Sequence, residues 1–430
     1  MLRRTAYALL VLALAGTATA CGRSAPDPAT AATARGPITV WLSNNAQEVQ
    51  WGRAMVAAWN KAHPDQHVTA QQIPAGKTSE EAISASIIAG TTACLAFNTS
   101  PAAVPTFQKQ NGLVPLSDFP DGEKYIAGRG GSLTDQYRSA DGKFYQLPWK
   151  SNPVMILYNK KLFAKAGLDP EHPKLATYKE FLETSRTLVH SGAAKAAIWP
   201  SPSSDFFQPW YDFYPAFAAQ SGGKQLIENG TPQFDSAAGR QVAAFWRTLY
   251  AEKLAPQEQY PGDSLNDGKA AMATVGPWAV AAYKDSVDIG VAPVPTADGG
   301  SGKHSFSDEK SVAMFSACEN RATAWDVLKF ASSAAQDGKF LEATGQMPMR
   351  ENLTAKYPGY FAENPMYKAF ADQAERVVEV PNVPGSIDIW QTFRDEWTKS
   401  VVFGRESTDA GLRKASSEIT GLLNEYGDPS

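Results

Sequence analysis

From residue 38 onward, apolar residues fall into short runs that alternate with segments of helical periodicity. The run Ile38–Leu42 is typical of a buried strand, and the apolar residues of 49–62 recur near helical spacing. The run 68–73 predicts a second strand, and 78–81 matches a capping box that begins a helix ending at Gly90. Strands that alternate with helices favour an α/β fold with a largely parallel sheet.

The same alternation continues through the rest of the chain. Further strands are predicted at 94–97, 144–148, 154–158, 287–291 and 311–315. Further helices are predicted at 177–190, 237–252, 322–332, 337–343 and, for the most part, 388–423. A chain of 430 residues is too long for one compact core, so the pattern indicates two lobes or domains.

The first 21 residues have the pattern of an export signal. Two arginines at 3–4 precede an apolar run at 6–15, and small residues at 18–20 come just before Cys21. The apolar run is about half the ~20 residues that a membrane-spanning helix needs. A cysteine at this point resembles the bacterial lipoprotein signal, which predicts that Cys21 is lipidated and that the protein is exported and anchored to the outer face of the cytoplasmic membrane. Ordinary cleavage that leaves Cys21 free is the alternative.

The segment 22–36 is rich in Ala, Thr and Pro and has almost no large apolar residue. Such a segment cannot bury enough surface to order itself. We therefore predict a flexible tether between Cys21 and the first strand.

The overall composition describes a soluble globular protein, since 43% of the residues are hydrophobic and 20% are charged. A formal net charge of -4 argues against nucleic acid or anionic lipid as the main partner. The aromatic content is more informative. Eleven Trp and fifteen Tyr provide flat faces with polar tips, which can bind a ligand as well as fill a core.

No catalytic or metal-binding constellation is evident. The sequence lacks a G-x-S-x-G nucleophile motif. His63 and His67 are four residues apart, but Pro64 breaks the helix that would align them on a metal. Acidic residues in loop-like segments leave a hydrolase with paired carboxylates as an alternative: Asp205, Asp212, Asp308 and Glu309. We predict no cofactor, no metal and no enzymatic activity.

Cys94 and Cys318 are the cysteines that remain once Cys21 is assigned to the lipid. Outside the cytoplasm such a pair can form a disulfide, and two buried free thiols are the alternative. The sequence alone does not give the Cα separation that decides between them.

Several segments occur in the same order as in a known protein family. They are 38–41, 59–65, 111–116, 141–148, 157–163, 268–272, 276–278, 290–295 and 345–350. Together they resemble the extracellular solute-binding proteins of ABC importers, in particular the carbohydrate-binding family that includes maltose-binding protein. The resemblance implies a two-lobe α/β fold of the periplasmic-binding-protein type, with a hinge and a ligand cleft between the lobes.

The resemblance also implies how the chain is divided. Lobe 1 comprises 37–148 and 312–350, and lobe 2 comprises 149–311 and 351–430. On this mapping Cys94 and Cys318 both belong to lobe 1, which favours the disulfide. The family implies a monomer that captures a carbohydrate and delivers it to the transmembrane subunits of an ABC permease, with contact to the membrane through the lipid anchor only.

A sugar has hydroxyl groups at its rim and an apolar face, so its site combines aromatic side chains with polar donors and acceptors. The candidate ligand-binding residues have these chemical types and follow strands, stand at a crossing between lobes, or lie in aromatic or family-like segments: Asn44, Asn45, Gln47, Asn98, Thr99, Ser100, Lys150, Ser151, Asn152, Trp210, Tyr211, Trp278, Asp308, Glu309 and Arg350. Trp278 is the first candidate for stacking on a sugar ring. Arg350 is included because its position often reaches the ligand in the family.

Each candidate has a simpler alternative. The aromatic residues can pack in a core, the residues after strands can cap helices, and those at the crossing can serve a hinge. The acidic residues can face water. For the whole protein, the alternatives are the same scaffold holding a glycerophosphodiester or another polar solute, for which Lys150 and Arg350 are a thin basic set, and a surface glycosidase or esterase.

Overall fold

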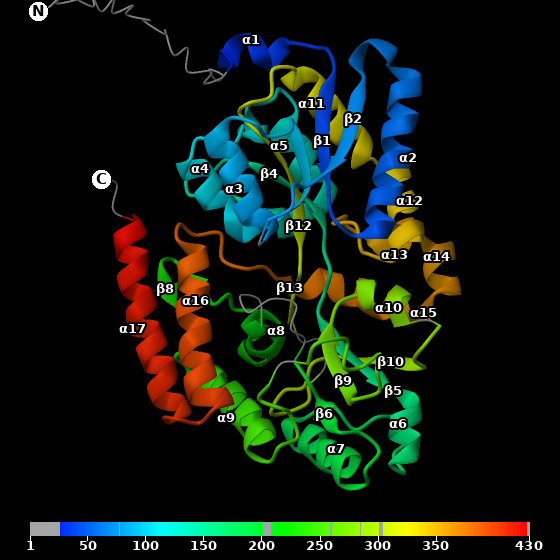
Figure 1. Cartoon of the computed structure of the whole chain (residues 1–430), viewed down its shortest axis with the longest axis vertical. Helices are drawn as coiled ribbons and strands as arrows, with labels where there is room; N and C mark the ends of the chain where they lie inside the picture. Colours follow the sequence, from blue (N-terminus) through cyan, green and yellow to red (C-terminus); the bar gives the residue numbers. More distant parts are fainter. Residues whose placement is uncertain are drawn as a thin grey trace, which may run out of the picture.

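The computed structural model describes residues 26–76, 78–200, 208–258, 260–283, 285–300 and 304–427. Within them the chain builds two main β-sheets, each with its own helices. Figure 1 shows the two resulting lobes, the first at the top and the second below it.

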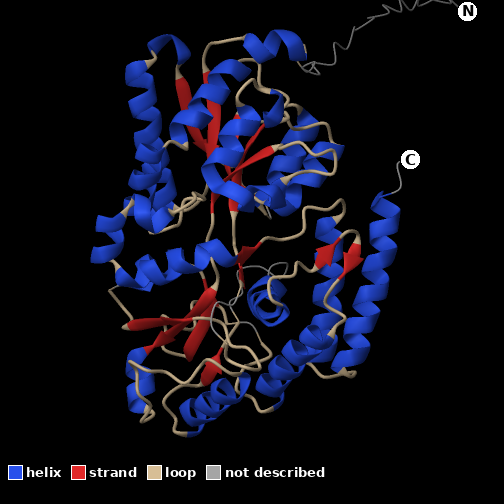
Figure 2. Ribbon diagram, turned by 180° about the vertical axis from the view of Figure 1, so that it is seen from behind, coloured by secondary structure: helices blue, strands red, loops and turns tan. Residues whose placement is uncertain are grey.

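The first lobe is built on a five-stranded sheet with the order β2-β1-β3-β12-β4. Its strands are β1 (Ile38–Leu42), β2 (Val68–Gln72), β3 (Leu95–Thr99), β4 (Gln146–Lys150) and β12 (Lys310–Met314). β1 runs parallel to β2 and β3, whereas β12 is antiparallel to β3 and β4. Figure 2 shows helices on both sides of this sheet.

Of the six helices that accompany the sheet of the first lobe, four lie close to the predicted bounds, whereas those at 104–109 and 122–130 were not predicted. The six helices are α2 (Ala46–Ala62), α3 (Ser79–Ala89), α4 (Val104–Lys109), α5 (Gly122–Gly130), α11 (Arg321–Ala331) and α12 (Ala334–Thr344). The Thr78 side chain caps α3, and Gly90 ends it in the left-handed conformation, with a φ of 65°.

The second lobe is built on a four-stranded sheet with the order β10-β5-β9-β6. Its strands are β5 (Met155–Asn159), β6 (Ala196–Ile198), β9 (Ala270–Val275) and β10 (Ile289–Ala292). β5 is antiparallel to both β9 and β10, so the prediction of a largely parallel sheet is wrong for this lobe. Alternation of strands and helices does not fix the direction of a strand, and β5, which enters this lobe from the first one, runs against both of its neighbours.

Short strand pairs and many helices complete the second lobe. The pairs are β7 (Ile227–Glu228) with β8 (Thr231–Pro232) and β11 (Ser305–Phe306) with β13 (Val377–Val378). The helices are α6 (Lys160–Lys165), α7 (Tyr178–His190), α8 (Gln208–Ser221), α9 (Ala237–Ala251), α10 (Trp278–Tyr283), α13 (Leu353–Lys356), α14 (Pro358–Glu363), α15 (Pro365–Gln373), α16 (Ser386–Trp397) and α17 (Thr408–Gly427). Across the described ranges, no helix has the length and apolar character needed to cross a bilayer.

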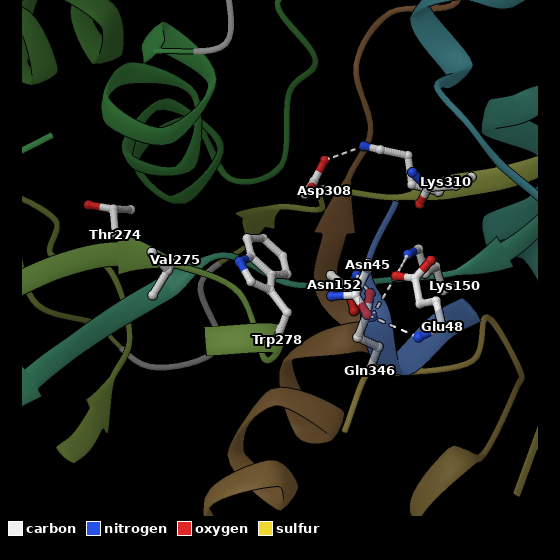
Figure 3. Close-up of a pocket in the computed structure, with 11 residues that line it drawn as sticks. Asn45, Glu48, Lys150, Asn152, Thr274, Val275, Trp278, Asp308, Lys310 and Gln346 are labelled. Atoms are coloured by element: carbon white, nitrogen blue, oxygen red, sulfur yellow. Dashed lines mark hydrogen bonds and ion pairs between the residues drawn. The ribbon is translucent and has the colours of Figure 1, made fainter. Parts of the chain in front are cut away.

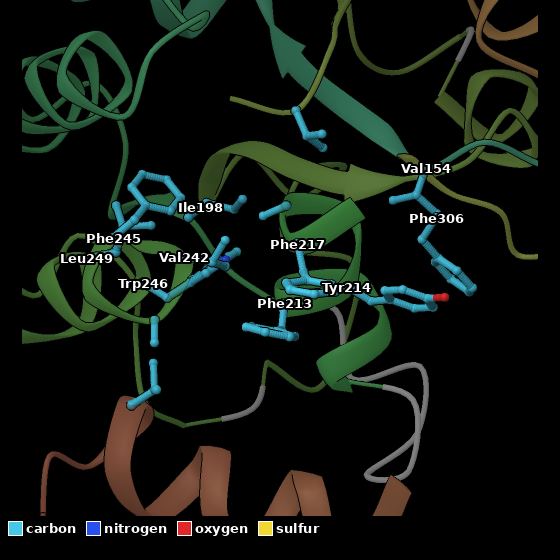
Figure 4. Close-up of a cluster of buried hydrophobic side chains, with 14 of the residues drawn as sticks. Val154, Ile198, Phe213, Tyr214, Phe217, Val242, Phe245, Trp246, Leu249 and Phe306 are labelled. Atoms are coloured by element: carbon cyan, nitrogen blue, oxygen red, sulfur yellow. The ribbon is translucent and has the colours of Figure 1, made fainter. Parts of the chain in front are cut away.

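Each lobe has its own core. In the first lobe, Val40, Leu95 and Phe97 are buried between the sheet and its helices. In the second lobe, α8 supplies much of the core: the ring of Phe213 stacks on that of Phe217 with centroids 5.5 Å apart, and Figure 4 shows them among the surrounding aromatic side chains. The sequence did not predict α8 as a helix because its aromatic residues have no clean period and Pro215 lies inside it.

The chain passes between the lobes at 151–154 and 307–309, and again after Arg350. β4 stays in the first sheet as far as Lys150, and β12 rejoins this sheet at Lys310. The first lobe therefore extends two residues further at each of these crossings than the division at 148 and 312 that the sequence suggested.

A disulfide joins Cys94 and Cys318, whose Cα atoms are 4.5 Å apart. Cys94 directly precedes β3, and Cys318 lies between β12 and α11. The bond therefore ties two distant parts of the sequence together within the first lobe.

The prediction of a flexible tether over 22–36 is wrong for its second half, because Pro28–Thr33 form helix α1. Asp27 caps this helix by accepting a hydrogen bond from the backbone N–H of Thr30 (2.9 Å), and Pro28 occupies its first turn. Ala31 is buried against α11. A short helix needs no large apolar residue when a small one packs closely on a neighbouring helix, which composition alone does not reveal.

Candidate functional site

A cavity of about 250 Å³ lies between the two lobes. Its lining comes from both lobes and from the connections between them: Asn45, Glu48, Asn98, Lys150, Asn152, Thr274, Val275, Trp278, Asp308, Lys310 and Gln346. Figure 3 shows Trp278 and Val275 on one side of this cleft, and Glu48, Lys150 and Gln346 on the other.

Two asparagines reach the cleft from the carboxyl ends of parallel strands. Asn45 follows β1 and caps α2, since its Oδ1 accepts a hydrogen bond from the backbone N–H of Glu48 (3.0 Å). Asn98, near the end of β3, has a φ of 75°, a left-handed conformation that asparagine adopts more readily than most residues. Such backbone strain is concentrated at functional sites, and here it occurs at a cleft residue.

The floor of the cleft is a network of buried polar side chains. Lys150 forms an ion pair with Glu48, and the two side chains are only 3% and 5% exposed. Gln346 donates a hydrogen bond to Oε1 of Glu48 (2.7 Å) and accepts one from Nδ2 of Asn152 (2.9 Å). Side chains from α2, from β4, from the connection at 151–154 and from the segment after α12 are thus held in one arrangement.

Burial and the ion pair have opposing effects on these two charged groups. Burial by itself raises the pKa of Glu48, but the charge of Lys150 and its hydrogen bond outweigh burial, and the pKa of Glu48 is lowered. For Lys150, burial outweighs the attraction to Glu48, and its pKa is lowered. Three neighbouring side chains stabilise the Glu48 carboxylate, and its negative charge in turn favours the ammonium form of Lys150.

A second ion pair borders the cleft. Asp308 accepts a hydrogen bond from Nζ of Lys310, and both side chains are mostly buried. Burial would lower the pKa of Lys310, but the neighbouring Asp308 carboxylate raises it overall. The four ionised side chains of the cleft therefore cancel in charge, and each ammonium group already has a carboxylate partner.

Trp278 presents the aromatic surface of the cleft from the start of α10. A Cβ atom built on Gly276 would lie 2.0 Å from Cζ3 of Trp278, so only glycine leaves room for this ring orientation. Among the described residues, no group of three or more His, Cys, Asp or Glu side chains could hold a metal ion. The cleft thus offers an aromatic face, several amide groups and two neutralised ion pairs.

The sequence model of the bacterial extracellular solute-binding proteins matches residues 44–338. The chain belongs to this family. The maltodextrin-binding protein MdxE of Bacillus subtilis (strain 168) is 27% identical over 305 residues, covering 67% of this chain and 69% of that protein. The galactooligosaccharide-binding protein of the same organism is 24% identical over 298 residues, covering 67% of this chain and 68% of that protein.

Two solved structures have the same fold as this chain. The cyclic alpha-maltosyl-1,6-maltose binding protein from Arthrobacter globiformis matches with a TM-score of 0.76 and 21% sequence identity. The match covers 91% of this chain and 100% of that protein's chain. The GacH receptor of Streptomyces glaucescens GLA.O matches with a TM-score of 0.74 and 23% sequence identity. The match covers 91% of this chain and 99% of the receptor's chain.

The cleft of this solute-binding protein contains six of the candidate residues chosen from the sequence: Asn45, Asn98, Lys150, Asn152, Trp278 and Asp308. They come from positions after strands, from a lobe crossing and from the Gly-Pro-Trp segment. For Asn45 the capping alternative also holds, because the same side chain caps α2.

Other candidates do not line this cavity. Asn44 and Gln47 are exposed to solvent beside it. Four more are buried in the protein instead: Thr99, Ser100, Ser151 and Glu309. Ser151 shows the reason, because its Oγ lies 3.1 Å from Oγ of Ser307 and so links two of the connections between the lobes.

Arg350 also lies outside the cavity. Its Nε donates a hydrogen bond to Oδ2 of Asp337 (2.7 Å), and its Nη2 donates one to the carbonyl oxygen of Ser332 (2.8 Å). Asp337 binds Arg129 as well (2.9 Å). Arg350, whose side chain was expected to reach the ligand, therefore binds Asp337 of α12 instead.

Trp210 and Tyr211 stand at the start of α8, and their side chains lie outside the described residues. Sequence reasoning missed five cleft residues: Glu48, Thr274, Val275, Lys310 and Gln346. For Glu48 a signal was present, because Asn45-x-x-Glu48 has the spacing of a capping box and places the glutamate in the first turn beside a chosen candidate.

Proposed function

We propose that this protein is the substrate-binding lipoprotein of an ABC importer and that it captures an uncharged carbohydrate between its two lobes. One observation carries the choice of ligand: both ammonium groups of the cleft, Lys150 and Lys310, are already paired with carboxylates. An anionic ligand would have to compete with these carboxylates. A sugar instead uses the aromatic face of Trp278 and the amides of Asn45, Asn98 and Asn152.

The relatives support this choice. Their names describe proteins that bind maltodextrin, galactooligosaccharide and diacetylchitobiose. A ligand that contacts both lobes favours the closed arrangement over the open one, and this shift is what a permease can sense. The protein would deliver the sugar to the permease as a monomer, chemically unchanged.

A phosphate-containing ligand is the second candidate, because one relative is the sn-glycerol-3-phosphate-binding periplasmic protein UgpB of Rhizobium meliloti, 23% identical over 423 residues. Calorimetry on a soluble Cys21→Ser variant that starts at residue 21 separates the two. We expect binding to at least one member of a panel of mono-, di- and oligosaccharides and none to sn-glycerol 3-phosphate or to glycerophosphodiesters. The reverse result would contradict the proposal.

The same mixtures test for an enzyme. After prolonged incubation with the purified protein, mass analysis should recover the bound saccharide intact. Appearance of shortened saccharides, at a rate that follows protein concentration, would identify a glycosidase instead.

We also propose that Cys21 carries the lipid, on the evidence of the charged start, the apolar run and the small residues before it. The N-terminal peptide of the membrane fraction should have the mass of a lipidated cysteine. Cys21→Ser should release the protein from the membrane without changing sugar affinity.

A further inference from the structure

The docked helix α1 begins at Pro28, so only a few residues separate the proposed lipid on Cys21 from the first lobe. Three contacts hold the segment after α1 in place. The carbonyl oxygen of Ala34 accepts a hydrogen bond from the N–H of Ala322 (3.2 Å), and that of Pro37 accepts one from Nδ2 of Asn320 (3.0 Å). Arg35 forms an ion pair with Asp326 of α11 (2.6 Å).

The reach of the tether follows from covalent geometry. From Cys21 to Asp27, the cap of α1, six residue steps span at most about 20 Å. If the chain were free as far as the first strand at Ile38, seventeen steps would reach almost 60 Å. The docking of α1 thus shortens the maximum distance between Cys21 and the folded lobe by about two thirds, relative to a chain that is free as far as Ile38.

The surface around this exit point differs from the cleft. A groove of about 970 Å³ runs there between the end of α3 and the segment after β12, and Pro26 is part of its lining. Ile88 borders the groove and is 77% exposed, more than any other large hydrophobic side chain in the described part of the chain; the next, Phe403, is 40% exposed. Among the described residues that line the groove, only Glu319 carries a charge.

We propose that this end of the first lobe, which we call the anchor face (the groove residues with Ile88), rests on the lipid surface of the membrane. The inference depends on the lipidation of Cys21 proposed above, and it replaces the expectation that only the lipid anchor contacts the membrane. A short tether keeps the anchor face at high effective concentration near the lipid, so even a weak contact is populated. Because this surface has one charged residue and an exposed isoleucine, its approach to lipid headgroups avoids most of the large cost of desolvating charged groups.

The position of the cleft fits this orientation. The anchor face lies at the amino ends of β1 and β3, since Ile38 and Cys94 are among its groove residues. Asn45 and Asn98, at the carboxyl ends of the same strands, line the cleft. The cleft therefore lies at the opposite end of these strands from the anchor face, and contact of that face with lipid leaves it open to solute.

Energy transfer from the protein to a headgroup acceptor tests the proposal. The lipidated full-length protein is reconstituted in phosphatidylcholine vesicles and labelled at Thr91→Cys, which is exposed in the anchor face, or at Lys165→Cys in α6, at the opposite end of the molecule in Figure 1. We expect several-fold more transfer from residue 91 than from residue 165. Equal transfer from both sites would overturn the proposal.

Two variants separate contact from proximity. Ala31→Asp combined with Arg35→Ala should undock α1 and bring the transfer from the two sites close to equality. Ile88→Asp should lower the transfer from residue 91 while α1 stays docked, and unchanged transfer would show that the anchor face does not touch lipid. Absence of lipid on Cys21 would also overturn the inference, whereas sugar binding by the soluble Cys21→Ser variant would still support the proposed function.

Discussion

Lys150 and Glu48 form a buried ion pair that joins the last residue of β4 to the first turn of α2 at the floor of the cleft. The two residues are 102 positions apart in the sequence, and their pairing places the lobe crossing at 151–154 next to the ligand site. The pair therefore belongs to both the framework of the first lobe and the surface that meets the solute.

Removing one charge of this pair should destabilise the protein strongly. Glu48→Gln leaves the ammonium group of Lys150 buried without a carboxylate, and such losses cost about 3–5 kcal/mol. Urea unfolding of the ligand-free protein measures the change. The double variant Glu48→Gln/Lys150→Met removes both charges, so we expect its loss of stability to be smaller than the sum for the two single variants. Additive losses would show that the two side chains do not act as a pair.

The orientation of Trp278 should depend on the absence of a side chain at residue 276. Gly276→Ala forces the ring to move, because the added Cβ would lie 2.0 Å from it. We expect the sugar affinity to fall by about tenfold or more, as it should in Trp278→Ala, since a displaced aromatic anchor loses about 1.4 kcal/mol or more. Calorimetry with the best ligand of the panel measures both.

Gly128→Ala is the matched control for this substitution. Gly128 lies in α5, outside the cleft, and a Cβ built on it meets no atom within 4 Å. This variant should keep the affinity of the natural protein. If Gly276→Ala also keeps it, Trp278 does not stack on the ligand in the orientation described here.

Local signals in the sequence were sufficient for many elements of the fold. The capping box at Thr177 and Glu180 begins α7, and Gly90 ends α3, because each needs only a few neighbouring residues to form. The helix α8 shows the opposite case. Its aromatic residues point to several neighbours in the core, so no single stripe of apolar residues marks the helix.

The site was predictable only in part for a related reason. Residues at strand ends, such as Asn45 and Asn98, could be proposed from the α/β pattern alone. Gln346 could not, because its role depends on a hydrogen bond to Asn152, 194 positions away. Arg350 does not line the cavity, because family resemblance gives a position, whereas the ion pair with Asp337 decides where the side chain points.

The disulfide should stabilise the fold without affecting the ligand. Cys94 and Cys318 close a loop of 224 residues, and loss of such a cross-link costs about 2–5 kcal/mol, chiefly because the unfolded chain gains freedom. We expect the double variant Cys94→Ser/Cys318→Ser to unfold at lower urea concentration. Its sugar affinity should be unchanged, because Cys94 precedes β3 whereas the cleft residue Asn98 lies at the far end of that strand. A large loss of affinity would show that the bond also shapes the cleft.

The crossing at 307–309 should make stability depend on pH. Glu309 is 1% exposed, and burial raises its pKa to about 8, with Ser311 and the nearby charges of Lys310 and Asp308 acting on the same carboxyl group. Burial, and then the proximity of Glu309, raise the pKa of Glu379 as well. Tyr137 donates a hydrogen bond to Glu379 (3.3 Å) from the first lobe.

The sign of the effect follows from proton binding. An unfolded glutamate loses its proton near pH 4.3, whereas the folded protein keeps the proton on Glu309 up to about pH 8. The contribution of this group to the free energy of unfolding is thus full below about pH 4 and is lost as the pH rises, by at most about 1.4 kcal/mol per pH unit.

Urea unfolding at several pH values between about 5 and 8 should show this decline. Glu309→Gln cannot ionise, so it should weaken the dependence to the part that Glu379 contributes, whereas substitution of the exposed Glu363 by Gln should leave it unchanged. The same pH dependence in all three proteins would mean that Glu309 is already ionised in the folded state and that its buried charge is stabilised by Lys310.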